Sequence, residues 1–254
     1  MAGKAAAKDC TASDESCLVA KLGAYVDLSE DELALLRRFE AEEQTYQRRK
    51  VVRRQGEEAS NLFVVKEGWC FTFVILPDGG RQVLDLHFPG DIVGQTSISF
   101  EKASSGIASA TRVTLCPFPK AHLDKVFLTA PRLTALLYSM AMLENVVLID
   151  RLKSVGRMEA RDRVAHFLLQ ILTRLRVTDT SLTARFHLPI SQELIGDALG
   201  LSAIHVNRTF RRLEEEGAIA REGQFVQILD EPRLVESVDF SNRFYRIETG
   251  WFPR

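Results

Sequence analysis

The chain has 254 residues, of which 46% are hydrophobic and 26% charged, and its formal net charge is −1. These values are typical of a globular protein of one or two domains and exclude a polycation, so any surface for nucleic acid has to be a local patch. No uninterrupted apolar run approaches the ~20 residues of a membrane span, and the first residues lack the apolar core of a signal peptide. We therefore expect a cytoplasmic protein with no membrane partner and with reduced cysteines.

The start of the chain is small and polar, which predicts a flexible N-terminus over residues 1–24. A helix is expected next, over residues 27–43. Acidic residues open this segment, and Leu33, Leu36 and Phe39 fall on one side of it.

The composition then changes to short runs rich in β-branched and aromatic residues, separated by turns at 77–80 and 89–91. Many short strands at such spacing predict a β barrel or sandwich, which we place within residues 25–130. The expected strands are Leu62–Lys66, Trp69–Leu76, Arg81–His87 and Ile107–Leu115.

From Pro131 to about Lys153 the apolar residues recur at helical spacing, and Ser154-Val155-Gly156 is expected to form a hinge. Residues 131–156 are thus a helix and hinge. Two interpretations of its broad apolar band stay open: its own domain covers the band, or part of the band pairs with the same helix of a second copy. We favour the second. The residues assigned to this dimer contact are Leu133, Leu136, Met140, Leu143 and Val147.

Residues 188–219 divide into two short helices around Gly200-Leu201-Ser202. Ser191 and Ser202 are suited to cap them, because a serine oxygen accepts an unpaired first-turn N–H. The second helix is expected at about 203–216. Its buried face is formed by Val206, Phe210 and Leu213.

The opposite face of this second helix carries Ile204, Asn207, Arg208 and Arg211, with Arg212 beside them. Amide and guanidinium groups on one side of a short helix can read base edges in a major groove of double-stranded DNA. The alternative is an ordinary helical hairpin with a solvated charged face. The acidic run 214–216 is expected to be the solvated end of the helix.

Two apolar runs within 218–229 surround a polar centre, which predicts a β-hairpin. Helices followed by a hairpin form a winged helix-turn-helix over residues 157–230, in which Arg221 is placed to meet a phosphate. The tail, 231–254, is rich in aromatic residues. It either folds back on the protein, which we favour, or contacts a partner such as RNA polymerase.

In this order, the segments resemble the CRP/FNR family of bacterial transcription regulators. The resemblance runs from about Tyr25 to Leu229, and includes the strand and glycine turn at 63–68 and the Pro-Gly-Asp turn within 86–94. It implies an α+β fold with a jelly-roll sensory barrel, a dimerisation helix and a winged reader. It also implies a homodimer on an inverted repeat, with recognition helices ~34 Å apart. Further residues assigned to the DNA contact are Gln192, Ser202 and Ala203.

The barrel departs from the cyclic-nucleotide members of that family. Their Pro-Gly-Asp turn is followed by a glutamate for the sugar, then by an arginine and a small residue for the phosphate; here the matching positions are Gln95, Ser105 and Gly106. A buried phosphate without a cation is poorly compensated. We expect no binding of cyclic AMP in the family's manner. The effector pocket is assigned to Gly90, Asp91, Gly94 and Gln95.

The cysteines also depart from the oxygen-sensing members, which hold a [4Fe–4S] cluster. Cys116 matches the family's barrel ligand, but only Cys10 and Cys17 precede the barrel, and a fourth thiolate would have to come from Cys70. Small buried hydrophobic side chains are the favoured interpretation of Cys70 and Cys116. No cofactor is therefore assigned.

The helix expected at 203–216 keeps one of the family's base-contacting residues. Arg208 corresponds to the family's arginine, and we expect it to bind the O6/N7 edge of a guanine, whereas the glutamate position is occupied by Ile204. An isoleucine can pack on a thymine methyl but cannot accept from cytosine, so the half-site should be related to the family's best-known sites without being identical.

The sequence thus predicts a DNA-binding transcription regulator and not an enzyme, since no nucleophile–base pair, metal set or phosphate loop is evident. A redox sensor with a cluster, and a ligand-sensing scaffold without DNA binding, are the alternatives. The effector stays open between a small molecule, a redox signal and none.

Overall fold

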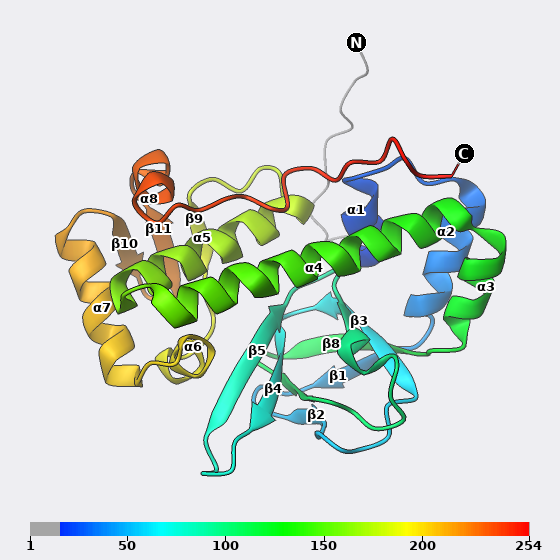
Figure 1. The fold of residues 1–254 in the computed structure, drawn as a ribbon, viewed down its shortest axis with the longest axis horizontal. Helices are drawn as coiled ribbons and strands as arrows, with labels where there is room; N and C mark the ends of the chain where they lie inside the picture. Colours follow the sequence, from blue (N-terminus) through cyan, green and yellow to red (C-terminus); the bar gives the residue numbers. More distant parts are fainter. Residues whose placement is uncertain (1–15, 254) are drawn as a thin grey trace. The chain divides into compact units, whose positions relative to one another are not determined.

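A computed structural model describes residues 16–253. The chain folds into two compact units. The first unit holds residues up to Met142 together with 178–180 and 246–254, and the second holds 143–177 and 181–245. Figure 1 shows the elements in chain order, from the blue α1 to the orange-red α8.

The core of the first unit is a barrel of two four-stranded antiparallel sheets. One sheet has the order β1-β8-β3-β6 and the other the order β2-β7-β4-β5. Alternate residues of these strands point inward, and a buried cluster that includes Val65, Ile107 and Leu115 fills the space between the sheets. The strands are β1 Gln44–Tyr46, β2 Val51–Arg53, β3 Asn61–Glu67, β4 Cys70–Ile75, β5 Arg81–His87, β6 Ile92–Val93, β7 Gly106–Ser109 and β8 Val113–Pro119.

One predicted strand is wrong. The segment expected as Ile107–Leu115 is two strands, β7 and β8, which belong to different sheets. The chain turns between them because the backbone N–H groups of Ala110 and Thr111 both donate to the carbonyl oxygen of Trp69, at 2.9 and 3.2 Å. Residues 110–112 contain neither glycine nor proline, so the composition of this segment did not indicate a turn.

The expected flexible N-terminus is wrong from residue 17 onward, while residues 1–15 lie outside the described part. Cys17–Gly23 form helix α1, capped by the Ser16 hydroxyl, which accepts from the Val19 N–H at 3.0 Å. Leu18 and Leu22 are buried. Packing onto the barrel stabilises a helix this short, which would be marginal alone.

The helix expected over 27–43 is shorter than predicted. Helix α2 spans Glu30–Arg37 and is followed by the 3₁₀ turn η1, Arg38–Glu40. Ser29 and Glu32 form a capping box, in which each side chain pairs with the other's backbone N–H. The barrel is followed by α3, His122–Thr129, which was not predicted from the sequence.

Helix α4 is continuous over Pro131–Arg157, so Ser154-Val155-Gly156 is not a hinge but part of the helix. Ser154 is buried and Gly156 is exposed, and both lie within the helix. By length and composition α4 could cross a membrane. It is not uniformly apolar, because Glu144 lies on it and pairs with Arg174 of α5, Ala160–Thr178, at 3.7 Å.

The predicted dimer face of α4 is corrected by the structure. Four of its five residues are buried within the chain, namely Leu133, Leu136, Met140 and Val147, and Leu143 is half-buried. A different stripe is exposed along the same helix. This exposed α4 stripe consists of Tyr138, Met142, Asn145, Ile149 and Leu152.

The second unit contains α5 to α8 and a small sheet with the order β10-β11-β9. Its tail folds back, as favoured from the sequence: Phe240 packs against His166 with ring centroids 5.1 Å apart, and Arg243 pairs with Asp150 at 2.8 Å. The remaining elements are β9 Arg185–His187, α6 Gln192–Leu199, α7 Ala203–Glu215, β10 Ile219–Glu222, β11 Phe225–Ile228 and α8 Glu231–Ser237.

Candidate nucleic-acid interface

Helices α6 and α7 form the predicted pair, and Figure 1 shows them next to each other in the yellow and orange part of the chain. Both predicted caps are confirmed: Ser191 accepts from the Leu194 N–H and Ser202 from the His205 N–H, each at 3.2 Å. The turn between the helices is tight. A Cβ on Gly196 would lie 2.3 Å from the Leu201 carbonyl oxygen, so this crossing requires glycine.

Helix α7 has one buried and one exposed face, as its sequence predicts. Val206, Phe210 and Leu213 are buried, which confirms the expected packing face. On the opposite side Ile204 is 76% exposed, and Arg208 is exposed four residues further along. An isoleucine this exposed contributes nothing to the core of the unit, which makes it available for a ligand such as a thymine methyl.

The arginines of α7 differ in whether the protein itself neutralises them. Arg208 and Arg211 are exposed and form no hydrogen bond or ion pair with any residue in the range 16–253. Arg212, in contrast, donates to Glu216 at 3.0 Å, and Glu216 also accepts from Arg161 of α5 at 2.9 Å. The unpaired positive charge of the helix is therefore concentrated at Arg208 and Arg211.

Arg221, on strand β10 of the predicted hairpin, is paired within the protein, contrary to expectation. Arg221 donates from Nε and Nη2 to the two carboxylate oxygens of Glu214, at 3.0 and 2.7 Å, and stacks over Phe210 at 4.7 Å. These hydrogen bonds lower the pKa of Glu214. The expectation of a solvated acidic run is therefore corrected for Glu214, which is half-buried and paired with Arg221, whereas Glu216 is exposed.

This pairing leads to a prediction for Glu214→Gln. The amide cannot hold Arg221 by charge, so the guanidinium becomes available to a phosphate, and DNA binding should tighten. One added phosphate contact steepens the slope of log K against log salt by about 0.9. Titrations at several salt concentrations measure both quantities. Adding Arg221→Gln to the same protein should restore the wild-type slope, and a slope unchanged by Glu214→Gln alone would refute the prediction.

The two helices are also joined by a polar contact. The Gln192 amide donates to Asn207 Oδ1 at 3.3 Å, so the predicted phosphate contact and the predicted base contact share one hydrogen bond. This orients the Asn207 side chain. Its own amide N–H groups are left to face a ligand.

A third strand, not predicted from the sequence, lies at the wing. Strand β9 pairs with β11, and its Arg185 lies over the ring of Phe225 at 4.6 Å while donating to Glu222 at 2.8 Å. Its other exposed residue, His187, is 3.1 Å from the Gln224 side chain. The alternation of exposed Arg185 and His187 around buried Phe186 was the available signal.

The four residues assigned to the effector pocket flank β6, Ile92–Val93. Gly90 is buried, and Asp91 forms an ion pair with Lys21 of α1. Gln95 donates to the Ile92 carbonyl at 3.0 Å. The assignment of these four residues to an effector contact stays a prediction.

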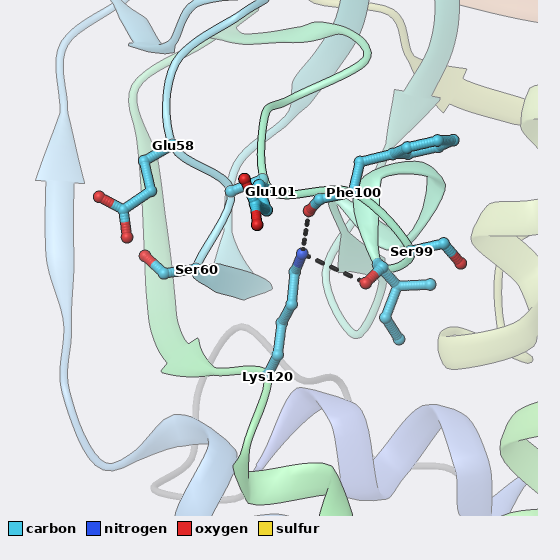
Figure 2. A pocket seen from close by; sticks show the side chains of 8 residues that line it. Glu58, Ser60, Ser99, Phe100, Glu101 and Lys120 are labelled. Carbon is cyan, nitrogen blue, oxygen red and sulfur yellow. Dashed lines mark hydrogen bonds between the residues drawn. The ribbon is translucent and has the colours of Figure 1, made fainter.

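A hollow exists elsewhere in this unit. Its lining comes from the loops that follow β2 and β6 and from the end of β8, and includes Glu58, Phe100 and Glu101. Figure 2 shows Lys120 reaching toward loop carbonyl oxygens, and its Nζ donates to those of Ile98 and Phe100 at 3.3 and 2.8 Å. It also donates to the Ser97 carbonyl at 2.7 Å. Lys120 thus holds the loop that follows β6, and the three N–H groups of its ammonium are all used in hydrogen bonds to that loop.

The cysteines do not assemble into the cluster site. Cys70 belongs to the core between the sheets, whereas Cys116 follows inward-facing Leu115 on β8 and points to the other side of the barrel wall. Burial, with a contribution from nearby acidic residues, raises the pKa of the Cys116 thiol to about 12. Cys17 is disulfide-bonded, so the expectation of reduced cysteines is wrong there, and Cys10 lies outside the described residues. Within the described residues, the set does not fit a four-thiolate cluster.

A β barrel followed by a winged helix-turn-helix defines a two-domain, DNA-binding regulator. The sequence profile of the cyclic nucleotide-binding domain matches residues 43–130, and that of the Crp-like helix-turn-helix domain matches residues 162–237. The first match covers β1 to α3, and the second covers most of α5 and all elements from β9 to α8.

Known proteins agree with this division. The transcriptional activator Anr of Pseudomonas aeruginosa is 30% identical over 183 residues, which is 71% of this chain and 74% of that one. The nitrogen fixation regulation protein FixK of Bradyrhizobium diazoefficiens is 32% identical over 179 residues, 69% and 73% of the two chains. The solved structure of FixK2 from Bradyrhizobium japonicum is 25% identical with a TM-score of 0.70, and covers 79% of this chain and 98% of that one.

The chain belongs to the CRP/FNR family of transcription regulators and carries that family's DNA-binding domain. The resemblance drawn from the glycine turns and the winged reader is therefore confirmed.

Proposed function

We propose that this protein is a homodimeric regulator that binds an inverted repeat in promoter DNA, with α7 of each protomer in a major groove. The observation that carries the proposal is the pair Arg208 and Arg211, which are exposed on α7 without a partner in the described chain. A guanidinium can bind the O6 and N7 atoms of guanine side by side. We assign Arg208 to that contact and Arg211 to the phosphates.

The proposed dimer contact is the exposed α4 stripe. Its residues are spaced four, three, four and three apart, which is the heptad spacing of a helix pair. Four are large exposed hydrophobic residues, with Leu152 at 73%, Tyr138 at 59%, Ile149 at 57% and Met142 at 43%. The single polar member, Asn145, is suited to fix the register of two identical helices.

We further propose that the barrel does not respond to cyclic AMP. The family's phosphate-binding positions are occupied here by Ser105, which carries no charge, and by Gly106. A Cβ on Gly106 would lie 2.6 Å from the Phe73 ring, so this ring occupies the space beside Gly106. Isothermal titration of the purified protein should show no heat of binding at micromolar cyclic AMP. Micromolar or tighter binding would refute this part of the proposal.

Selection from a pool of random DNA duplexes tests the proposed function. We expect the recovered sequences to share an inverted repeat whose half-sites are one helical turn apart. Failure to enrich any sequence would favour the scaffold that has lost DNA binding. We place the protein in the bacterial cytoplasm with the chromosome, as a regulator without enzymatic activity, and RNA polymerase as its expected further partner.

A further inference from the structure

The chain continues past the winged reader and packs back on two helices of the second unit. The match to the Crp-like helix-turn-helix domain ends at residue 237, so residues 238–244, here called the tail clasp, lie beyond it. Val238 and Phe244 of the clasp are buried, and Phe240 is half-buried. Burial of apolar side chains holds a segment more firmly than exposed charges do, so the clasp is an integral part of this unit.

The tail clasp contacts α4 through two ion pairs. Arg243 donates from Nε and Nη2 to the two carboxylate oxygens of Asp150, at 2.8 and 3.2 Å. Two parallel hydrogen bonds of this kind fix an orientation as well as a distance. Lys153 donates to Asp239 at 3.1 Å, but both side chains are exposed and their pair contributes little. The pair of Arg243 and Asp150 therefore defines where the clasp lies on α4.

The aromatic rings of the tail clasp contact α5. Phe240 packs edge-on against the ring of His166, with centroids 5.1 Å apart, and Phe244 lies under the guanidinium of Arg174 at 5.6 Å. The clasp and the two helices enclose a void of about 10 Å³, which is too small for more than one water molecule. The three segments thus pack directly against one another.

The tail clasp spans a junction that is short and open to bending. Helix α4 ends at Arg157 and α5 begins at Ala160, so only two residues join them. Such a connection fixes the distance between the helix ends, but a few residues at the ends of elements can absorb a large change of angle. Because the clasp is bound to both helices at once, it restrains the angle between them.

We propose that the tail clasp holds α4 at a set angle to α5 and thereby determines which spacing of two half-sites the dimer accepts. Ile149 and Leu152 of the exposed α4 stripe lie next to Asp150 and Lys153, which bind the clasp, while α5 leads into the reader. In the homodimer, the angle between α4 and α5 sets the distance between the two α7 helices. The restraint rests on the contacts above, whereas its role in half-site spacing rests on the proposed function.

Titration against duplexes of different half-site spacing tests the proposal. One base pair inserted between the half-sites turns one against the other by about 35°. The wild type should then bind about 10²-fold more weakly, because both half-sites can no longer be bound together. In the clasp variant Phe240→Ala/Arg243→Asp, one ring is lost and a carboxylate faces Asp150. Its loss on the inserted duplex should be less than about 10-fold, with wild-type affinity for a single half-site.

Two further variants separate the clasp from general damage to the tail. Tyr245→Ala/Arg246→Asp makes the same types of change at the next two residues, both of which are exposed, and should keep the wild-type spacing penalty. Adding Asp150→Arg to the clasp variant restores an ion pair of reversed polarity. This triple variant should recover part of the spacing penalty, which a merely disrupted surface would not do.

Hydrogen exchange of the free, full-length protein reports on the junction without DNA. There the Met158 N–H donates to the Ser154 carbonyl at 3.0 Å and the Arg163 N–H to the Glu159 carbonyl at 2.9 Å. These amides should exchange at least about 10-fold faster in the clasp variant, because the restraint on the junction is lost.

The proposal is overturned if junction exchange is unchanged in the clasp variant, if that variant keeps the full spacing penalty, or if the control variant loses the penalty equally. A wild type that binds no duplex refutes the regulator, and the role in spacing falls with it. The exchange measurement then decides by itself whether the clasp restrains the two helices.

Discussion

Replacing Ile149 and Leu152 together by glutamate is expected to convert the protein to monomers and to weaken binding to its inverted repeat by about 10²–10⁴-fold. Both side chains are exposed on the α4 stripe, so the change leaves the interior of each protomer intact. Four carboxylates at one helix pair would repel one another across the contact. The second half-site would then no longer be bound at high effective concentration. Sedimentation velocity and DNA titration measure the two effects.

A matched control separates dimerisation from general surface damage. Leu128, on α3, is 82% exposed, and Leu128→Glu should change neither mass nor affinity. Binding to a duplex with one half-site should be equal for the wild type and the double α4 variant, because each reader is intact. A double variant that stays dimeric with full affinity would show that another surface joins the protomers.

Arg208→Ala is expected to cost about 1–3 kcal/mol for each half-site and to relax the preference at one base pair. The reason is geometric: Arg208 is exposed on the reading face of α7, and its planar fork matches the guanine edge. Arg208→Lys keeps the charge but loses the fork, so most of the specificity should still be lost. Titration against duplexes that vary one base pair at a time gives the result.

Arg212→Ala is the control for this experiment, because Arg212 lies four residues further along the same helix but is held by Glu216. We expect it to change binding much less than Arg208→Ala. If Arg208→Ala instead weakened binding to all duplexes equally and reduced the salt slope, Arg208 would be a phosphate contact and the assignment to a base would be wrong.

The reader could be predicted from the sequence because its signals are local. Ser191 and Ser202 cap within three residues, Gly200 ends α6 in the left-handed conformation, and the buried residues of α7 follow one helical period. The barrel was predicted for a similar reason, since its turns are marked by glycine and proline. Neither inference needed a contact between distant segments.

Several of the errors involve contacts that the local sequence pattern does not reveal. Helix α1 is stabilised by packing on the barrel and by the ion pair between Lys21 and Asp91. The sequence around residue 21 does not indicate this partner, which lies 70 residues further along the chain. The apolar residues of α4 surround much of the helix, so periodicity could not separate the face packed within the chain from the exposed one. Arg221 is neutralised across a turn by Glu214.

The central claim is that two copies of this chain bind one inverted repeat through α7. Sedimentation equilibrium of the full-length protein with the selected duplex, at micromolar concentration, tests it most directly. We predict a complex of two protomers on each intact duplex, and weaker binding of the same dimer to a duplex with a single half-site. One protomer on the intact repeat, or no complex with any duplex, would contradict the claim.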